Sequence, residues 1–193
     1  MSLRRQRGIH PRDQLMLWSA FTLAFFGFLR VSEFTADTLT RFRPESTLLD
    51  SDYSLTSVLT LNIKASKTDP LRRGHTVTIA PSRRSVCAMR AMHHYNPPAT
   101  HKPLYRFVNG SYLTRQTLTK HVRNLLTHSM VPNSGHYASH SFRRGAATTA
   151  ADAGLPDWLI KVLGRWRSDA YQVYVSTPND IISKVPALLA GNH

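Results

Sequence analysis

The chain has 193 residues, enough for one domain with a buried core and too few for two comfortable ones. Hydrophobic residues make up 41% of it and aromatic residues 9%, proportions that exclude the disordered and low-complexity classes. Lysine and arginine number 25 against 11 aspartates and glutamates, a net charge of +14 that favours a polyanionic partner. The single cysteine, Cys87, excludes an internal disulfide framework and any zinc site that needs two or more cysteines.

A basic arm and a long apolar segment open the chain. The arm, residues 1–12, carries four arginines: Arg4, Arg5, Arg7 and Arg12. Residues 13–29 are apolar on every side, which predicts a helix buried all round. The most apolar stretch, residues 15–29, is shorter than the ~20 residues that a bilayer span requires, and it does not open the chain as a signal peptide would. We therefore expect no membrane span and no secretion signal.

Two runs of alternating apolar residues then predict a β-hairpin with a basic tip. The first run contains Leu55, Leu59, Leu61 and Ile63, and the second contains His75, Val77 and Ile79. The turn-forming pairs Asp69-Pro70 and Arg73-Gly74 lie between the runs. The tip carries Lys67, and Lys64 stands at the end of the first run.

The rest of the chain is predicted to be mainly helical. Helical periodicity and stop signals indicate helices over residues 82–95, 114–128 and 141–153, with a short strand over 104–107. A further helix, ending at Gly164, should turn an apolar stripe toward the core: Leu155, Trp158, Leu159, Val162 and Leu163. A short helix with Tyr171 and Tyr174 and a tail helix over 179–189 follow. The predicted fold class is mainly α with a small antiparallel β-sheet (α+β), in one domain over residues 13–193.

The acidic residues argue against metal-dependent phosphoryl chemistry. A two-metal nuclease needs converging carboxylates, and the only close pair, Asp50 and Asp52, falls in a predicted loop. Glycine-rich phosphate loops are also absent from the sequence. Cleavage of a phosphodiester without metal needs cations on the non-bridging oxygens, a side-chain nucleophile, and an acid for the leaving oxygen. We therefore expect no metal and no cofactor.

The sequence offers candidate residues for the cations and for the acid, and each candidate also has a purely structural explanation. Arg30 follows the apolar helix, and Glu33 could fix its guanidinium, but a helix-end charge is the simpler account. His140 and Arg143 lie three apart at a helix start that suits phosphate, or are merely exposed beside a capping serine. Lys67 could donate the proton, with Lys64 as a rival or with both simply solvated.

Two tyrosines near the end of the chain are candidate nucleophiles. Tyr171 and Tyr174 are three apart on a predicted helix, so both could point inward. Most tyrosines so placed belong to a core or an interface. The residues alone do not choose between them.

Taken in chain order, these segments resemble the catalytic domain of the tyrosine recombinases, the phage-integrase family. Gly27-Phe-Leu-Arg30-Val-Ser-Glu33 is similar to the first arginine box of that family, and the hairpin with Lys67 to its β-strand lysine. His140-Ser-Phe-Arg143 is similar to the HxxR box, and the segment 163–174 to the His/Trp-to-tyrosine segment. The phrases Ser-Lys-Thr-Asp-Pro and Gly-Arg-Trp-Arg-Ser-Asp-Ala-Tyr are most similar to the eukaryotic DIRS-type retrotransposon branch.

The resemblance implies the tyrosine recombinase or type IB topoisomerase-like catalytic fold and a role for each residue. Arg30 and Arg143 would clamp the scissile phosphate, and His140 would hydrogen-bond it. Lys67 would protonate the departing 5′-oxygen, and a tyrosine would form a 3′-phosphotyrosine link without a cofactor. Alignment on Gly164 places the nucleophile at Tyr174 rather than Tyr171. The same alignment puts Arg165 where the family has His or Trp, and we assign that role to the neighbouring Trp166.

The resemblance also implies partners and a place in the cell. Double-stranded DNA is the expected partner, with a homo-tetramer formed on it through the tail helix, and a nuclear location follows from the DNA and from a reducing compartment. The upstream domain that completes the family's DNA clamp is expected to be absent. Two other functions stay open: a catalytically lapsed, domesticated DNA-binding module, and a relaxing activity like that of a type IB topoisomerase.

Overall fold

The computed structural model describes residues 8–65 and 73–174 of the chain. Helices and strands follow in the order α1 (Pro11–Phe26), α2 (Val31–Phe34), β1 (Tyr53–Leu55), β2 (Leu59–Ile63), β3 (His75–Ile79), α3 (Ala88–Tyr95), α4 (Arg115–His128), the 3-10 turn η2 (Ser134–His136), α5 (Ser141–Asp152), α6 (Asp157–Gly164) and the 3-10 turn η3 (Asp169–Tyr174). This mixture of helices and one small antiparallel sheet is the predicted fold class.

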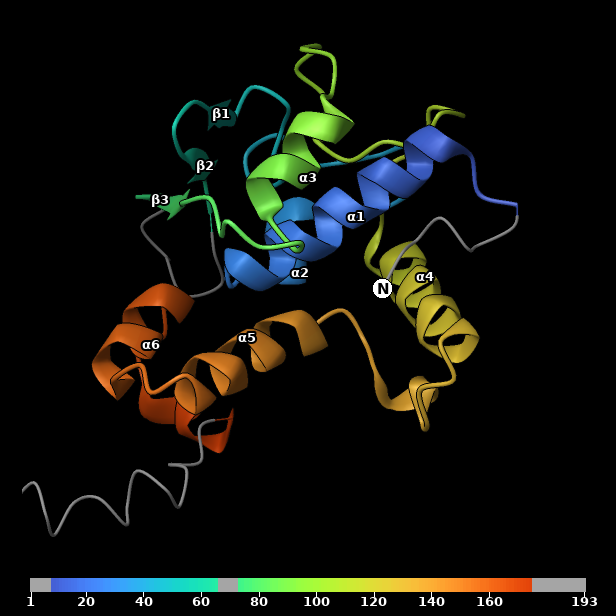
Figure 1. Ribbon diagram of the computed structural model, residues 1–193. Coiled ribbons are helices and arrows are strands. Elements are labelled where there is room, and N and C mark those ends of the chain that lie inside the picture. Colours follow the sequence, from blue (N-terminus) through green and yellow to red (C-terminus); the bar gives the residue numbers. More distant parts are fainter. Residues whose placement is uncertain (1–7, 66–72, 175–193) are drawn as a thin grey trace, which may run out of the picture.

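Helix α1 runs through the middle of the fold, with α3 packed on one side and α5 on the other (Figure 1). Met16, Leu17 and Leu23 have no exposed surface, which confirms the predicted buried helix, although Leu15 is 40% exposed. The helix begins at Pro11 because proline suits a first helical position, and the His10 side chain accepts a hydrogen bond from the Arg12 amide. The helix also ends before residue 29, at Gly27.

The sheet has three antiparallel strands in the order β1-β2-β3. The predicted hairpin is confirmed, with Leu61 opposite Val77 and both side chains buried. Leu55 was expected to share a strand with Leu59. Instead the chain reverses over residues 56–58, where the Thr56 amide bonds the Val58 carbonyl, and Leu55 faces Leu59 from β1.

Two predicted elements are shorter or missing. The helix expected over 82–95 begins only at Ala88, because the Ser82 hydroxyl binds the Val86 carbonyl and holds the preceding residues in a loop. The strand expected over 104–107 is not formed. This segment makes scattered hydrogen bonds instead, such as the one from the Leu104 amide to the Leu48 carbonyl, and only isolated bridges.

Helices α5 and α6 and the turn η3 form a small second core against the end of α1. Its buried members are Phe28, Ala146, Ala147, Ala150, Ala151, Ile160 and Tyr171. The predicted inward stripe is confirmed only for Leu155, which packs against this core: Trp158 is 67% exposed and Val162 60%, whereas Ile160 is fully buried. The stripe assumed a helix from Leu155, but α6 starts after Pro156, and its inward face is set by contact with α5.

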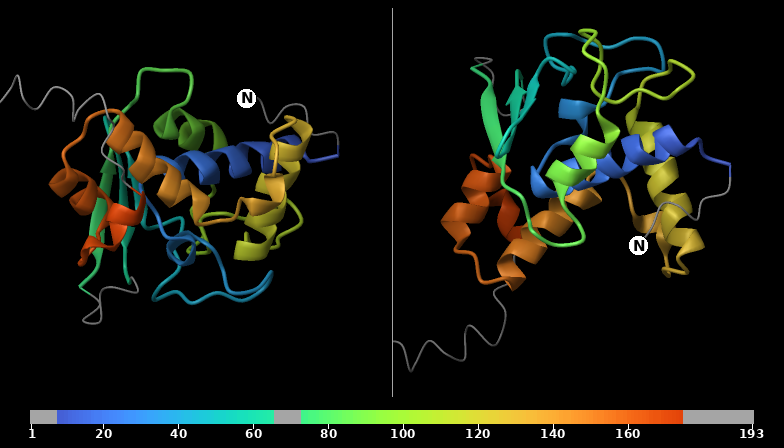
Figure 2. Two further views of the ribbon diagram at one scale, coloured as in Figure 1. Left: turned by 90° about the horizontal axis from the view of Figure 1, so that it is seen from below. Right: turned by 45° about the horizontal axis from the view of Figure 1, so that its top comes forward.

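Different elements lie at the two ends of α1 (Figure 2). All views agree that the sheet and α6 lie at the C-terminal end of α1, and α4 at the other. The predicted tail helix over 179–189, the arm residues 1–7 and the hairpin tip with Lys67 lie outside the described residues. Over residues 8–65 and 73–174, no helix is both long enough and apolar enough to span a membrane.

Candidate active site

Arg30 is placed by a tight turn at the end of α1. A side chain at Gly27 would come within 2.9 Å of the Leu23 carbonyl oxygen, so only glycine fits there. The next residue, Phe28, takes a left-handed conformation with φ of 49°. This turn brings Arg30 to the N-terminus of α2, where its side chain is 16% exposed.

Glu33 holds Arg30 at two points. One carboxylate oxygen accepts the Arg30 backbone amide at 2.9 Å, and the other accepts the guanidinium Nη1 at 3.2 Å. Glu33 is only 1% exposed, so this is a buried carboxylate with a charged partner. The contact predicted from the three-residue spacing is present, and Arg30 is more than a solvated helix-end charge.

Arg143 lies in the first turn of α5 and is 8% exposed, so the alternative that it is merely exposed is wrong. Its Nη1 donates to the Phe28 carbonyl at 2.6 Å, and its Nη2 donates to the Gly164 carbonyl. One guanidinium thus ties the end of α1 to the end of α6. His140, by contrast, is exposed at the N-terminal cap of the same helix.

Arg165 completes the cluster from the end of α6. It follows Gly164 in a left-handed conformation, with φ of 54°. Its Nη2 lies 2.7 Å from a Glu33 oxygen, and its Nη1 donates to the Gly27 carbonyl at 3.2 Å. The Arg165 carbonyl in turn accepts Arg30 Nη2 at 3.4 Å. Glu33 is therefore shared by two arginines that lie 135 residues apart.

Burial and charge both act on Arg165. Its side chain is 9% exposed, and burial is the main cause that lowers its pKa. The Glu33 carboxylate opposes that shift, and the nearby charge of Arg30 adds to it. Its Nε is buried without a hydrogen-bond partner.

The Trp166 ring packs against the arginine cluster. Its ring lies directly against Gly164, where any side chain would collide with it. The Arg143 guanidinium carbon stands 4.2 Å from the centre of the ring, within cation–π range. Phe28 meets the ring edge-on, with centroids 6.4 Å apart. Trp166 therefore orients Arg143 and joins the second core.

The two tyrosines differ in what the structure describes. The Tyr171 ring is 4% exposed and packs against Trp166, with centroids 5.7 Å apart. Tyr174 ends η3, and its side chain lies outside the described residues, as does all of Lys67. The structure thus joins Arg30, Arg143 and Trp166, places His140 exposed at the start of α5, and leaves the positions of Lys67 and of the Tyr174 side chain untested.

His75 is a residue near the cluster that the sequence did not single out. It opens β3, directly after the hairpin tip. Burial lowers its pKa, the charge of Arg165 lowers it further, and Glu33 opposes both. The base of the hairpin therefore lies within electrostatic reach of the Arg165–Glu33 pair. The only feature of the sequence that could have pointed to His75 as a site residue is its place directly after the predicted hairpin tip.

The arrangement can bind an anion. The guanidinium groups of Arg30 and Arg165 pair with one carboxylate, and that of Arg143 shares the Phe28 carbonyl with Arg165, which leaves an excess of positive charge in a largely buried setting. Guanidinium groups hold phosphate oxygens through paired hydrogen bonds and stabilise added negative charge on them. Within the described part of the chain, no three His, Cys, Asp or Glu side chains gather as metal ligands would.

No protein-family model matches the sequence, and no curated protein is significantly similar to it. Solved structures do match in fold. XerH site-specific recombinase bound to its difH substrate superposes with a TM-score of 0.70 at 14% identity, over 99% of this chain and 51% of that one. XerA recombinase gives a TM-score of 0.64 at 14% identity, over 93% and 58%. The Tn1549 transposon integrase in complex with circular-intermediate DNA gives 0.65 at 12%, over 95% and 62%.

These likenesses concern the fold. At identities of 12 to 15%, they show that the chain has the architecture of a tyrosine recombinase catalytic domain, which confirms the predicted fold. The chain spans about half the length of the XerH structures that it matches.

Proposed function

We propose that this domain, which has the tyrosine recombinase catalytic fold, cleaves and rejoins DNA at specific sites through a covalent 3′-phosphotyrosine intermediate. The observation that carries the proposal is the arginine cluster around Glu33. Its members, Arg30, Arg143 and Arg165, come from three of the four sequence boxes that resemble the recombinases. The similar structures of XerH with its substrate and of Flp with a Holliday junction are DNA complexes, which supports DNA as the substrate.

The chemistry follows from the charge of the cluster. Arg30 and Arg143 bind the non-bridging oxygens of the scissile phosphate, and His140, exposed at the start of α5, adds a hydrogen bond. The Tyr174 hydroxyl gives up its proton to solvent and its oxygen attacks phosphorus, the bond to the 5′-oxygen breaks, and Lys67 gives that oxygen a proton. Attack by a 5′-hydroxyl reverses the step and releases the tyrosine. The reaction needs no further reactant.

Tyr174 is the better nucleophile candidate because of what surrounds Tyr171. Tyr171 is buried in the second core beneath Trp166, a position typical of a packing residue. Movement of its hydroxyl to a phosphate would expose that core. The role of Lys67 as the proton donor is supported by the position of His75, which follows the hairpin tip in the chain. The charges of Arg165 and Glu33 both act on His75, so the base of the hairpin lies close to the cluster.

The role assigned to Trp166 is divided between two residues in this proposal. Trp166 packs on the Arg143 guanidinium and fixes its orientation. Arg165 supplies the positive charge that balances Glu33. The histidine or tryptophan of the family is thus replaced by an arginine for charge and a tryptophan for packing.

A basic face on α4 is a second region for DNA contact. A hollow of about 680 Å³ is lined there by polar side chains that include Arg115, Lys120 and Arg123. Arginines and lysines in such a groove bind phosphates without reading sequence, and the neighbouring amides of Gln116 and Asn124 can read bases. A tetramer on DNA through the tail helix, a nuclear location and an origin in a DIRS-type element complete the proposal.

One observation favours a second function, that of a DNA-binding module without catalysis. In the described structure the inner donors of Arg143 are occupied by the carbonyls of Phe28 and Gly164, and those of Arg165 partly by Gly27. Such an arrangement can stabilise the fold without serving a phosphate.

Trapping distinguishes the two functions. Random-sequence DNA bound by the protein is selected first, and the enriched sites are rebuilt as suicide substrates that lose a short 5′-fragment after cleavage. We expect a denaturant-resistant protein–DNA adduct with the wild-type protein and with Tyr171→Phe, and none with Tyr174→Phe. Tight, salt-dependent binding without any adduct would refute strand cleavage and leave the binding module.

A further inference from the structure

A separate hollow lies at the opposite end of α1 from the arginine cluster. It encloses about 390 Å³ and is lined by Arg12, Tyr95, Lys102, Arg106, Phe107 and Tyr112, among others. Arg12 stands in the first turn of α1 and Arg30 follows its last, so the helix separates the two sites by about 24 Å, at 1.5 Å per residue. The proposed strand cleavage makes no use of this hollow.

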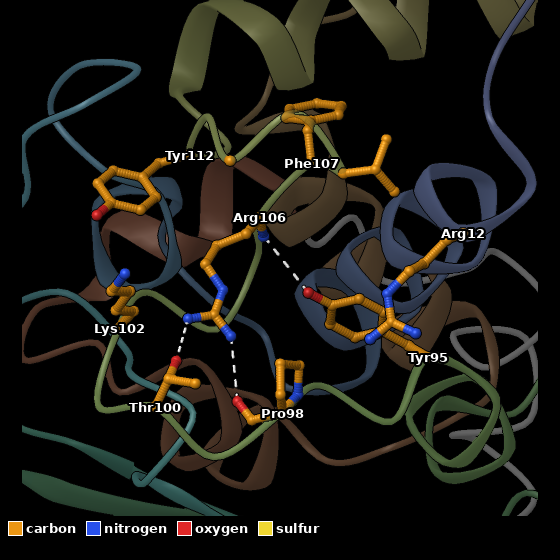
Figure 3. Close-up of a pocket in the computed structure, with 10 residues that line it drawn as sticks. Arg12, Tyr95, Pro98, Thr100, Lys102, Arg106, Phe107 and Tyr112 are labelled. Carbon is orange, nitrogen blue, oxygen red and sulfur yellow. Dashed lines mark hydrogen bonds between the residues drawn. The ribbon is translucent and has the colours of Figure 1, made fainter.

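Arg106 forms a fixed centre in it (Figure 3). Its guanidinium donates to the Thr100 hydroxyl and, at 3.1 Å, to the Pro98 carbonyl, and it pairs with Asp50 at 3.2 Å. The side chain is only 12% exposed and Asp50 only 1%. An arginine held this way does not need to be ordered when a ligand arrives, which reduces the entropy cost of binding.

Two further cations stand at the sides of the hollow. Figure 3 shows Lys102 on one side of Arg106 and Arg12 on the other. Lys102 is exposed, and the hydrogen bond from the Arg12 guanidinium to the Asn96 carbonyl is long, at 3.5 Å. The charges of Arg106 and Arg12 reach the interior: burial raises the pKa of Tyr95, and Arg106 and Arg12 both oppose that rise. The hollow therefore attracts anions.

Aromatic rings supply the other half of a binding surface. Phe107 and Tyr112 flank the hollow above and beside Arg106 in Figure 3. The Tyr112 ring is braced edge-on by Phe42 at 5.4 Å, and the Phe107 ring by His121 at 5.8 Å. Braced rings next to cations are the usual means by which proteins bind a base and its phosphate together.

We propose that this hollow binds a single unpaired nucleotide, with its base against Tyr112 or Phe107 and its phosphate between Arg12 and Lys102. The volume lies within the range of small-ligand pockets. A bare phosphate would leave the aromatic walls unused, and a stacked duplex cannot present a base to them. A free nucleotide and an unpaired base within a DNA strand share this chemistry, and the test separates the two sources.

The test uses the full chain with Tyr174→Phe, so that it is independent of strand cleavage. Calorimetry measures the affinity for dAMP, deoxyadenosine, inorganic phosphate, and a hairpin DNA with or without one extrahelical base. We expect dAMP to bind at least tenfold more tightly than phosphate or deoxyadenosine alone. Tighter binding of the hairpin with the extrahelical base than of the hairpin without it would identify a DNA strand as the source, and equal binding of the two hairpins would identify a free nucleotide.

Variants locate the site. Lys102→Gln and Tyr112→Leu should each weaken dAMP binding about tenfold, through loss of a charged hydrogen bond and of stacking respectively. Arg84→Gln, an exposed arginine outside the hollow, carries the same charge change as Lys102→Gln and should leave the affinity unchanged. The backbone amide signals of Val108 and Gly110 should shift on titration. Equal affinities in all three variants, or equal affinity for dAMP and phosphate, would overturn the proposal.

Discussion

Replacement of Glu33 by glutamine tests whether the arginine cluster is held by one buried carboxylate. Glu33 accepts three hydrogen bonds from positively charged or backbone donors: the Arg30 amide at 2.9 Å, Arg30 Nη1 at 3.2 Å and Arg165 Nη2 at 2.7 Å. Glutamine keeps the shape and one acceptor oxygen, but it removes the charge that balances two arginines exposed by 16% and 9%. Two charge-assisted bonds at about 1.5–3 kcal/mol each sum to about 3–6 kcal/mol, and broken buried ion pairs cost about 3–5 kcal/mol, so we expect a loss of about 3–5 kcal/mol.

Urea unfolding at pH 7 measures this loss, with Glu45→Gln as the matched control. Glu45 is exposed, so its replacement should change the free energy of unfolding by less than about 0.5 kcal/mol. If Glu33→Gln does not fold, Arg165→Met gives a second measurement, because it removes one partner and leaves the Arg30 pair in place. A loss below about 1 kcal/mol in Glu33→Gln would refute the view that Glu33 organises the cluster.

Three further predictions follow from burial and charge. Ile160→Ala should cost about 2–5 kcal/mol in urea unfolding, and Val162→Ala less than about 0.5, because the first side chain is fully buried and the second 60% exposed; similar costs would contradict the orientation of α6. In NMR titration, His75 should have a pKa below its ordinary 6.5; Arg165→Met should raise it and Glu33→Gln should lower it, and the opposite signs would refute the contact. Because the unfolded chain then binds the His75 proton more readily, the share of stability that depends on this group should be lost as pH falls through 6.5 toward the folded pKa, and a His75→Gln variant should show a weaker dependence.

Local spacing was enough to predict some of the site. Arg30 and Glu33 are three residues apart at a helix start, so their contact depends on little beyond the formation of α2. The apolar segment before them was predictable as a buried helix, because so long an apolar run exceeds the length of a buried strand. The hairpin followed from alternation in the same way. These features depend on neighbours in sequence, and pattern alone could identify them.

The rest of the cluster depends on contacts that no local pattern contains. Arg165 and Glu33 are 132 residues apart, and their pairing requires α6 to end against the turn after α1. The sequence marked Arg165 only as a departure from the family, and it gave no reason to bury it. The face of α6 was predicted wrongly for a related cause: Trp158 and Val162 are apolar, but the space beside α5 admits Ile160. Which apolar face turns inward is decided by the neighbouring helix.

The replacement of a histidine or tryptophan by Arg165 changes the charge balance around the phosphate in the proposed reaction. Glu33 alone would neutralise Arg30, to which it is bonded at two points. With Arg165 on the second carboxylate oxygen, the three guanidinium groups of the cluster retain an excess of positive charge. In this proposal that excess meets the extra negative charge that develops on the phosphate during tyrosine attack. Arg165→His would therefore restore the family's residue type and still reduce cleavage, because Glu33 would again offset the charge of Arg30; an adduct yield equal to that of the wild type in the suicide-substrate assay would contradict this account.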